Sequence, residues 1–385
     1  MHDSLADPPR VTTRLGYHPA LDGIRAISIL AVMLYHSGLL IHGGFLGVDV
    51  FFTLSGFLIT TLLIEEHAGT GRIGLRDFYC RRALRLLPAL VPVVIVSGIA
   101  MIVTAGPARV VGMSLFVLAV IFYVANWAAI AGLPQGMLGH AWSLSIEEQF
   151  YLAWPPVLAV LLRRVRARWL LVAGLALATL GSIIFRYHLA ASGATGRRFF
   201  LGTDAHADPI LIGCATACCV SWGFLRGSRD PSPSTRRRWQ VAALAAAAVL
   251  VAVLVVARLP DDYARRGAST IVAVAAGILI VDVLQPGSRL APVLAWSPLV
   301  WIGKRSYALY LWHFPVFFLA GALWASGLLE YLPSRILPAW LVTFALAAAS
   351  YHWIEAPALR LKSRFAGWPA DRTAASPAAA VAPAD

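Results

Sequence analysis

An arginine and a histidine stand in the first strongly apolar run of the chain. This run reads LDGIRAISILAVMLYHSGLLI and carries Arg25 and His36, eleven positions apart. On a helix this spacing is about 16 Å along the axis and close to three full turns, so both side chains would share one face. An ionisable group at membrane depth costs roughly 2.5–3.5 kcal/mol, so we expect a function for it. His36 could accept a proton from a hydroxyl or attack an acyl group itself.

Acidic residues in later apolar runs could complete such a centre. Asp49 lies in the second run, and Glu147 and Glu148 are adjacent in WSLSIEEQFYLAWP. Consecutive helix residues point about 100° apart, so one of the two glutamates should face inward. We expect that glutamate to orient His36 or to exchange a proton with it. No metal is expected, because the chain has no HExxH motif and no Cys/His set.

Two arginines form an RxxR pattern at the start of the third apolar run. They are Arg82 and Arg85, within RRALRLLP. Guanidinium groups bind phosphates well, so a phosphate-bearing donor could dock here from the cytoplasm and reach toward His36. Alternatively, Arg82 and Arg85 could only set the topology, and Arg25 could only extend along a helix end toward the membrane surface.

Aromatic and histidine side chains gather in two further segments. HAWSL carries His140 and Trp142, and SYALYLWHFP carries Tyr310 and His313. Each of these side chains could contact a substrate, and each could equally be an interfacial aromatic or a packing residue.

The composition is that of a membrane protein. Of 385 residues, 59% are hydrophobic and 13% are charged, and the mean hydropathy is +0.72, which excludes an ordinary soluble domain. The net charge is +13. Because the basic residues lie mostly in short loops, the positive-inside rule accounts for this charge, and nucleic-acid binding is not expected.

The apolar runs predict an all-α bundle. Eleven runs read as helices by length: 21–41, 44–65, 86–106, 110–131, 145–162, 169–190, 207–226, 239–257, 268–285, 305–327 and 336–358. If all arginine-rich loops lie in the cytoplasm, the chain must cross the membrane an even number of times between Arg85 and Arg163. The sequence has three apolar runs there, so one of them should not cross. We therefore predict ten transmembrane helices, cytoplasmic termini, and a re-entrant or surface-lying segment within 110–142.

Five blocks of this sequence, in this order, resemble the membrane-bound acyltransferase-3 family, which contains O-antigen, peptidoglycan and macrolide O-acyltransferases. The blocks are LDGIRAISILAVMLYH, GGFLGVDVFFTLSGFLIT, FYCRRALRLLPAL, HAWSLSIEEQFYLAWP and IGKRSYALYLWHFPV. The resemblance implies acyl transfer, typically of acetyl, from acyl-CoA to a hydroxyl of a carbohydrate, lipid-linked glycan or macrolide acceptor. A separate extracytoplasmic protein that accepts the acyl group is a further expected partner, alongside membrane lipid.

The resemblance also assigns roles to residues. It implies catalytic roles for Arg25, His36 and Glu147, the first acid of its block. It implies donor binding by Arg25, Arg82 and Arg85. Substrate contacts are then expected from the remaining polar and aromatic positions of the blocks, namely Asp49, Ser55, Trp142, Tyr310 and His313.

The expected organisation is one membrane domain with short flanks. Residues 1–20 form a cytoplasmic segment, residues 21–362 the acyltransferase domain, and residues 363–385 an Ala/Pro-rich disordered tail. The protein is expected in the plasma (inner) membrane. The rival interpretation is a proton-coupled transporter or flippase, in which His36, Glu147 and Asp49 form a proton relay.

Overall fold

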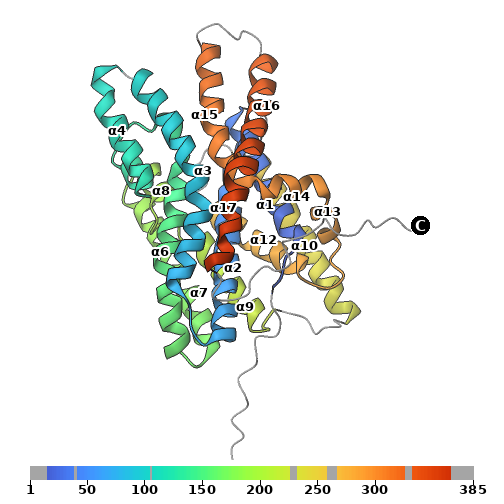
Figure 1. Ribbon diagram of the computed structural model, residues 1–385. Coiled ribbons are helices and arrows are strands. Elements are labelled where there is room, and N and C mark those ends of the chain that lie inside the picture. The colour runs from blue at the N-terminus through green and yellow to red at the C-terminus, as the bar shows by residue number, and fades with distance from the viewer. Residues whose placement is uncertain are drawn as a thin grey trace, which may run out of the picture.

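The computed structural model describes residues 15–38, 41–104, 106–225, 232–257, 267–325 and 332–365 (Figure 1). All regular secondary structure in these ranges is helical, as predicted. The expected disordered tail lies, from residue 366 onward, outside the described residues, as do residues 1–14. The first three residues of that tail, 363–365, belong to a 3₁₀ helix that spans Leu361–Phe365.

The apolar runs correspond to the main helices of the bundle. The main helices are α1 (Pro19–His36), α2 (Gly47–Thr70), α3 (Leu75–Thr104), α4 (Pro107–Ile121), α6 (Ala141–Arg164), α7 (Arg168–Ala191), α9 (Asp208–Ser221), α10 (Pro233–Val256), α12 (Ala268–Val283), α15 (Ser306–Ala325) and α16 (Leu332–Ser350). Short elements connect them: η1 (His42–Leu46), α5 (Ala125–Ile130), η2 (Gly136–Leu138), α8 (Gly196–Leu201), α13 (Leu290–Leu294), α14 (Ser297–Lys304), η3 (Tyr351–Glu355) and α17 (Ala356–Arg360).

Several of these helices are long and apolar enough to cross a membrane. Among the described residues six qualify by length and composition, and three shorter apolar helices accompany them. The chain is a multi-pass membrane protein. The number of ten crossings stays a prediction.

The most enclosed long helix is α2, which packs closely against α9. A Cβ atom on Gly56 of α2 would lie 2.1 Å from the Ile210 carbonyl oxygen, and one on Gly213 of α9 would lie 2.1 Å from the Thr53 carbonyl oxygen. Only glycine therefore allows the two backbones to approach this closely. Gly56 therefore has a packing role in the middle of α2, and the neighbouring Ser55 is buried.

The chain between α3 and α6 is interrupted within residues 110–142, where the loop charges predict a segment that does not cross; the crossing itself stays a prediction. Helix α4 returns from the α3–α4 hairpin and ends at Ile121; Tyr123 follows with φ 55°, and α6 completes the path (Figure 1). Side chains of α6 satisfy the opened backbone: Ala125 N–H donates to Ser145 Oγ at 3.1 Å, and Gln149 Nε2 donates to the Tyr123 carbonyl at 2.8 Å. Irregular backbone at membrane depth needs such partners.

Helix α3 begins at the end of the molecule where α6 finishes. Phe78, near the start of α3, belongs to the same apolar cluster as Leu158 of α6, and Val165 packs against that cluster. The Tyr79 hydroxyl also donates to the Leu152 carbonyl at 2.8 Å. The arginine-rich segments around residues 72–85 and 163–168 therefore share one end of the bundle, as the charge parity requires.

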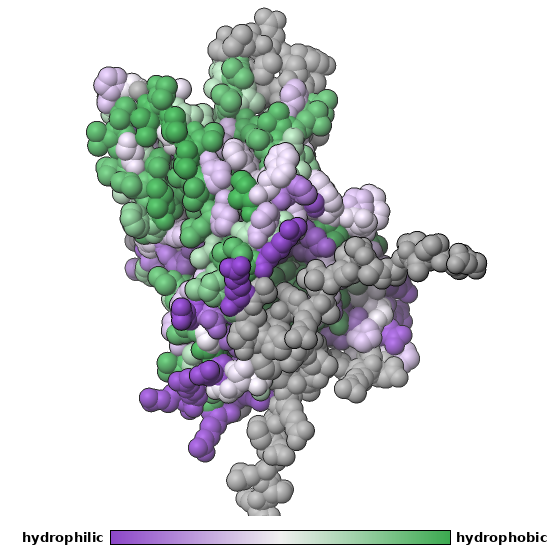
Figure 2. Space-filling model, viewed as in Figure 1, coloured by the Kyte–Doolittle hydropathy of each residue, from purple (hydrophilic) through white to green (hydrophobic). Residues whose placement is uncertain are grey.

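The outer surface fits a lipid environment. Figure 2 shows hydrophobic side chains covering α3 and α4, with hydrophilic ones gathered toward the opposite end of this face. The exposed apolar side chains on these two helices include Val91, Ile95, Ile99, Val103, Val111, Leu115 and Leu118. Exposing such a surface to water is unfavourable, so we expect the hydrocarbon tails of membrane lipids to cover it.

Candidate active site

Three histidines from different helices meet inside the bundle. His36 ends α1, His313 lies in α15, and His140 immediately precedes α6. The His313 ring centroid lies 5.1 Å from that of His36 and 5.5 Å from that of His140. Phe314 contacts both His36 and His140, with ring centroids 5.0 and 5.1 Å away. His313 and His140 are buried and His36 is half-buried, so this is an enclosed imidazole cluster.

Hydrogen bonds hold this cluster in place. His313 Nδ1 lies 2.6 Å from the Tyr310 carbonyl oxygen and 3.2 Å from that of Leu309. The Tyr310 hydroxyl donates to the His140 carbonyl at 2.9 Å and lies 2.5 Å from Ser143 Oγ. Tyr310 thus connects α15 to the start of α6, and His313 stands directly beside His36.

A second polar cluster surrounds Arg82 of α3. Its Nη2 lies 3.1 Å from Glu148 Oε1 and 3.5 Å from Glu147 Oε1, and its guanidinium stacks 3.5 Å from the Tyr151 ring centre. The Ser55 and Tyr151 hydroxyls both donate to Glu147 Oε1. Glu147 is therefore fixed by α2, α3 and its own helix together.

Two neighbouring arginines have no such partner. Among the described residues, no carboxylate lies within 4.0 Å of Arg25 or Arg85. Both side chains are half-buried, and Arg25 and Arg82 lie close enough to Arg85 to repel it. Glu355, which ends the one-turn π-helix η3, attracts Arg85 from a longer distance. This concentration of positive charge is a ready anion-binding site.

The structure does not place Glu147 beside His36. The two residues share no hydrogen bond or ion pair, and the described partners of Glu147 are Ser55, Tyr151 and Arg82. The imidazole next to His36 belongs to His313 instead. Orientation of His36 by a glutamate is thus a wrong expectation, because α6 directs Glu147 toward Arg82.

Asp49 and Trp142 belong to a third cluster that sequence reasoning missed. Asp49 Oδ1 lies 2.7 Å from His206 Nε2, and both side chains are 1% exposed. His206 Nδ1 lies 2.6 Å from the Phe200 carbonyl oxygen, and the Trp142 ring stacks on the imidazole at 5.9 Å. Burial works to lower the pKa of His206, but the Asp49 carboxylate, together with Asp208 and the Phe200 carbonyl, outweighs it and raises the pKa above its ordinary value.

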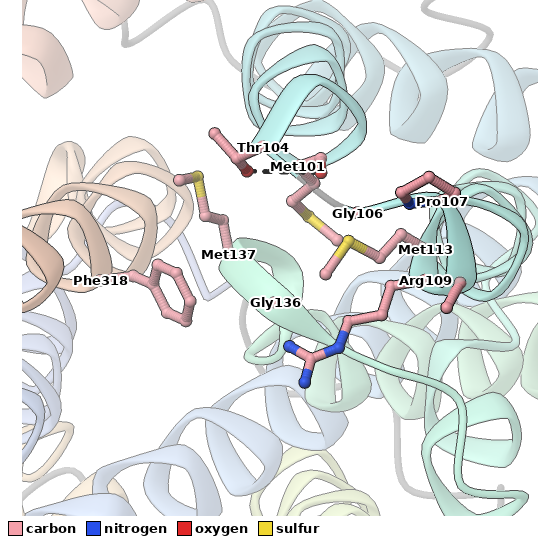
Figure 3. Close-up of a pocket in the computed structure, with 10 residues that line it drawn as sticks. Met101, Thr104, Gly106, Pro107, Arg109, Met113, Gly136, Met137 and Phe318 are labelled. Carbon is pink, nitrogen blue, oxygen red and sulfur yellow. Dashed lines mark hydrogen bonds between the residues drawn. The ribbon is translucent and has the colours of Figure 1, made fainter.

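A cavity of about 460 Å³ opens at the far end of α3 (Figure 3). Its lining residues include Met101, Met137, Arg109 and Phe318. Phe318 is one helical turn beyond Phe314, which touches the imidazole cluster.

The cavity and the arginines lie on opposite sides of the imidazole cluster. The Tyr307 hydroxyl of α15 donates to the Leu86 carbonyl of α3 at 3.2 Å, so Tyr307 lies at the level of Arg85. Met101 is sixteen residues beyond Arg85, about 24 Å along α3. His313 lies between Tyr307 and Phe318 on α15, so the cluster falls between the two ends.

These features define a helical membrane protein with an enclosed polar centre, and the chain matches a known family over most of its length. The model of the acyltransferase-3 family, described as an acyltransferase domain, covers residues 18–353. The chain therefore belongs to this family.

Named relatives agree with this assignment. The Bacillus subtilis (strain 168) protein named "Putative peptidoglycan O-acetyltransferase YrhL" is 36% identical over 354 residues, which cover 89% of this chain and 55% of that protein. "O-acetyltransferase OatA" of Staphylococcus aureus (strain NCTC 8325 / PS 47) is 33% identical over 351 residues, covering 89% and 57%. The chain spans about half the length of the curated relatives it matches. No solved structure matches the chain.

Proposed function

We propose that this chain is a membrane O-acyltransferase that moves an acetyl group from acetyl-CoA to a hydroxyl of a carbohydrate-type acceptor. Its site would lie in the plasma membrane, with both termini and the arginine cluster on the cytoplasmic side. The names of the relatives favour an acetyl donor and a glycan acceptor.

One arrangement carries this proposal. Arg25 and Arg85, which have no carboxylate within 4.0 Å among the described residues, stand on one side of the imidazole cluster, His36 lies about 16 Å from Arg25 along α1, and the cavity opens on the other side of the cluster. The arginines would bind the CoA phosphates, and the extended pantetheine arm would bring the thioester to His36. The acceptor would approach through the cavity.

At His36 the transfer needs one proton acceptor. The acceptor oxygen attacks the thioester carbonyl carbon while its hydroxyl proton moves to His36 Nε2. The carbon–sulfur bond then breaks, and the CoA sulfur takes that proton from the imidazolium, which leaves His36 neutral again. In the alternative order, His36 Nε2 itself attacks the thioester, and the resulting acyl-imidazole transfers its acyl group to the acceptor.

The test measures acetyl-CoA consumption by the purified protein in lipid nanodiscs, with a peptidoglycan fragment as acceptor. His36→Ala should reduce transfer by at least about 10²–10⁴-fold. His188→Ala, which removes an exposed histidine of α7, is the matched control and should transfer normally. With acetyl-labelled acetyl-CoA and no acceptor, label bound to the wild-type protein but not to His36→Ala would identify the acyl-imidazole route. If wild-type protein consumes no acetyl-CoA but moves protons across sealed vesicles, the transporter interpretation replaces this proposal.

A further inference from the structure

The tautomer of His313 follows from its hydrogen bonds. Its Nδ1 faces two carbonyl oxygens, of Tyr310 and Leu309, which can only accept. This nitrogen therefore carries the proton. No carboxylate of the described residues lies within 4.0 Å of His313, and a charged imidazole here would be buried without a counter-ion. His313 is thus neutral, and its Nε2 presents a lone pair.

That lone pair faces His36. His313 Nε2 lies 3.2 Å from His36 Nδ1, which also lies 3.1 Å from the Val32 carbonyl oxygen. Both neighbours of this nitrogen are acceptors, so His36 carries its proton on Nδ1. Its Nε2 is consequently unprotonated, as a proton acceptor or a nucleophile requires. The Val32 carbonyl oxygen already takes part in the backbone hydrogen bonds of α1. His313 Nε2 has no competing backbone donor, so it is the acceptor for the Nδ1 proton of His36.

We infer that His313 is the positioning residue of this centre. It accepts the Nδ1 proton of His36, keeps His36 Nε2 free for the reaction, and shares the charge that appears when Nε2 gains a proton. In many hydrolases a carboxylate accepts the Nδ1 proton of the catalytic histidine, but here Glu147 and Glu148 contact Arg82 instead. The role of His36 in this inference rests on the proposed function, whereas its tautomer does not.

The test combines spectroscopy with activity. Protein labelled with ¹⁵N in histidine is compared as wild type, His313→Gln and His313→Leu, with the His36 signals assigned by their loss in His36→Ala. Gln can place its oxygen near the former Nε2 and accept the same proton, whereas Leu cannot. His140→Leu is the control, because it removes a buried imidazole of the same cluster that has no hydrogen bond to His36.

Wild type, His313→Gln and His140→Leu should all show His36 with its proton on Nδ1. His313→Leu should show a mixture of tautomers, and acetyl transfer should fall in kcat by about 10-fold, less than the 10²–10⁴-fold of a lost general base, because His313 acts through His36. His313→Gln should recover most of that loss.

Two results would overturn the inference. One is an Nε2-protonated His36 in wild type, and the other is an unchanged His36 signal in a folded His313→Leu variant. If instead the tautomer responds as expected but the protein consumes no acetyl-CoA, or His36→Ala transfers normally, the proposed function or the proposed role of His36 fails, respectively, and His313 remains the partner that sets the tautomer.

Discussion

At the residue scale, the arginines divide by what surrounds them. Arg82 already neutralises two glutamates and stacks on Tyr151, whereas Arg25 and Arg85 repel each other and have no carboxylate within 4.0 Å among the described residues. Arg82 is built into the protein interior, and the other two are the ones that we propose to bind the donor phosphates.

Replacing these arginines should therefore have opposite effects on stability. Arg85→Ala should weaken acetyl-CoA binding by roughly 1.5–3 kcal/mol per lost charged hydrogen bond, and it should leave the melting temperature without ligand unchanged or higher, because a repulsion is removed. Arg82→Ala should lower the melting temperature, since it leaves Glu147 and Glu148 without their cation.

Donor titration and thermal melting of each purified variant measure both effects. Arg163→Ala removes an exposed arginine at the end of α6 and serves as the control. An Arg85→Ala variant that melts lower while binding the donor normally would show that Arg85 is structural.

At the element scale, the interrupted α4–α6 path depends on amide side chains. Gln149 donates to the Tyr123 carbonyl and to Asn126 Oδ1, and Asn126 donates to the Leu201 carbonyl and to Thr203 Oγ1. The network replaces the helix hydrogen bonds that the break removes, and it links α5 and α6 to the segment after α8.

Gln149→Leu should destabilise the protein by about 1–3 kcal/mol, because buried polar groups lose their partners. Gln240→Leu is the matched control: Gln240 also donates to a carbonyl, that of Gly287, but at an exposed position. Denaturation of both variants in the same detergent compares them directly. Equal losses would mean that the break does not need its side-chain network.

The Asp49–His206 pair should make stability depend on pH. Because the pKa of His206 is raised in the folded protein, the stabilisation is complete below the ordinary pKa of about 6.5 and is lost as pH rises through the raised value. Asp49→Asn should therefore lower the melting temperature more at pH 6 than at pH 9.

Asp204→Asn is the control, since its more exposed carboxylate pairs with Arg198 and titrates far below this range. Melting at both pH values, followed by tryptophan fluorescence, measures the difference. An Asp49→Asn loss that is the same at pH 6 and pH 9 would contradict the pair's proposed charge state.

The apolar runs predicted the helices, and the charged and aromatic residues within them drew attention to His36, His140 and His313. The sequence did not predict which side chains contact each other. Arg25 and His36 share one helix, so their spacing fixes their separation. By contrast, Asp49 meets His206 157 positions away, and Ser55 meets Glu147 92 positions away. Such contacts arise from helix packing, which one sequence does not reveal. His206 lies in a loop with no recognisable motif. Glu355 lies in a one-turn π-helix, which is too short to produce a repeating pattern in the sequence.

At the scale of the whole molecule, both arginine-rich segments share one end of the bundle. Single cysteines in place of Arg76 and Arg166, both exposed, should react with a membrane-impermeant maleimide from the same side. Ala108→Cys, at the outer end of the α3–α4 hairpin, should react from the other side. Labelling of intact and opened vesicles, in a background without the four native cysteines, decides this. Opposite accessibility of positions 76 and 166 would require another full crossing between them.

The cluster of Arg25, Arg82 and Arg85 has a consequence for handling the protein. Arg25 and Arg85 repel each other, and an anion that binds between them as proposed would lower that repulsion and stabilise the folded protein. Occupancy and folding are then linked, so the ligand-bound protein tolerates heat and detergent better than the empty one. Free CoA, which carries the phosphates without the acyl group, would act as a chemical chaperone during extraction from the membrane, and its benefit would fade as salt screens the charges.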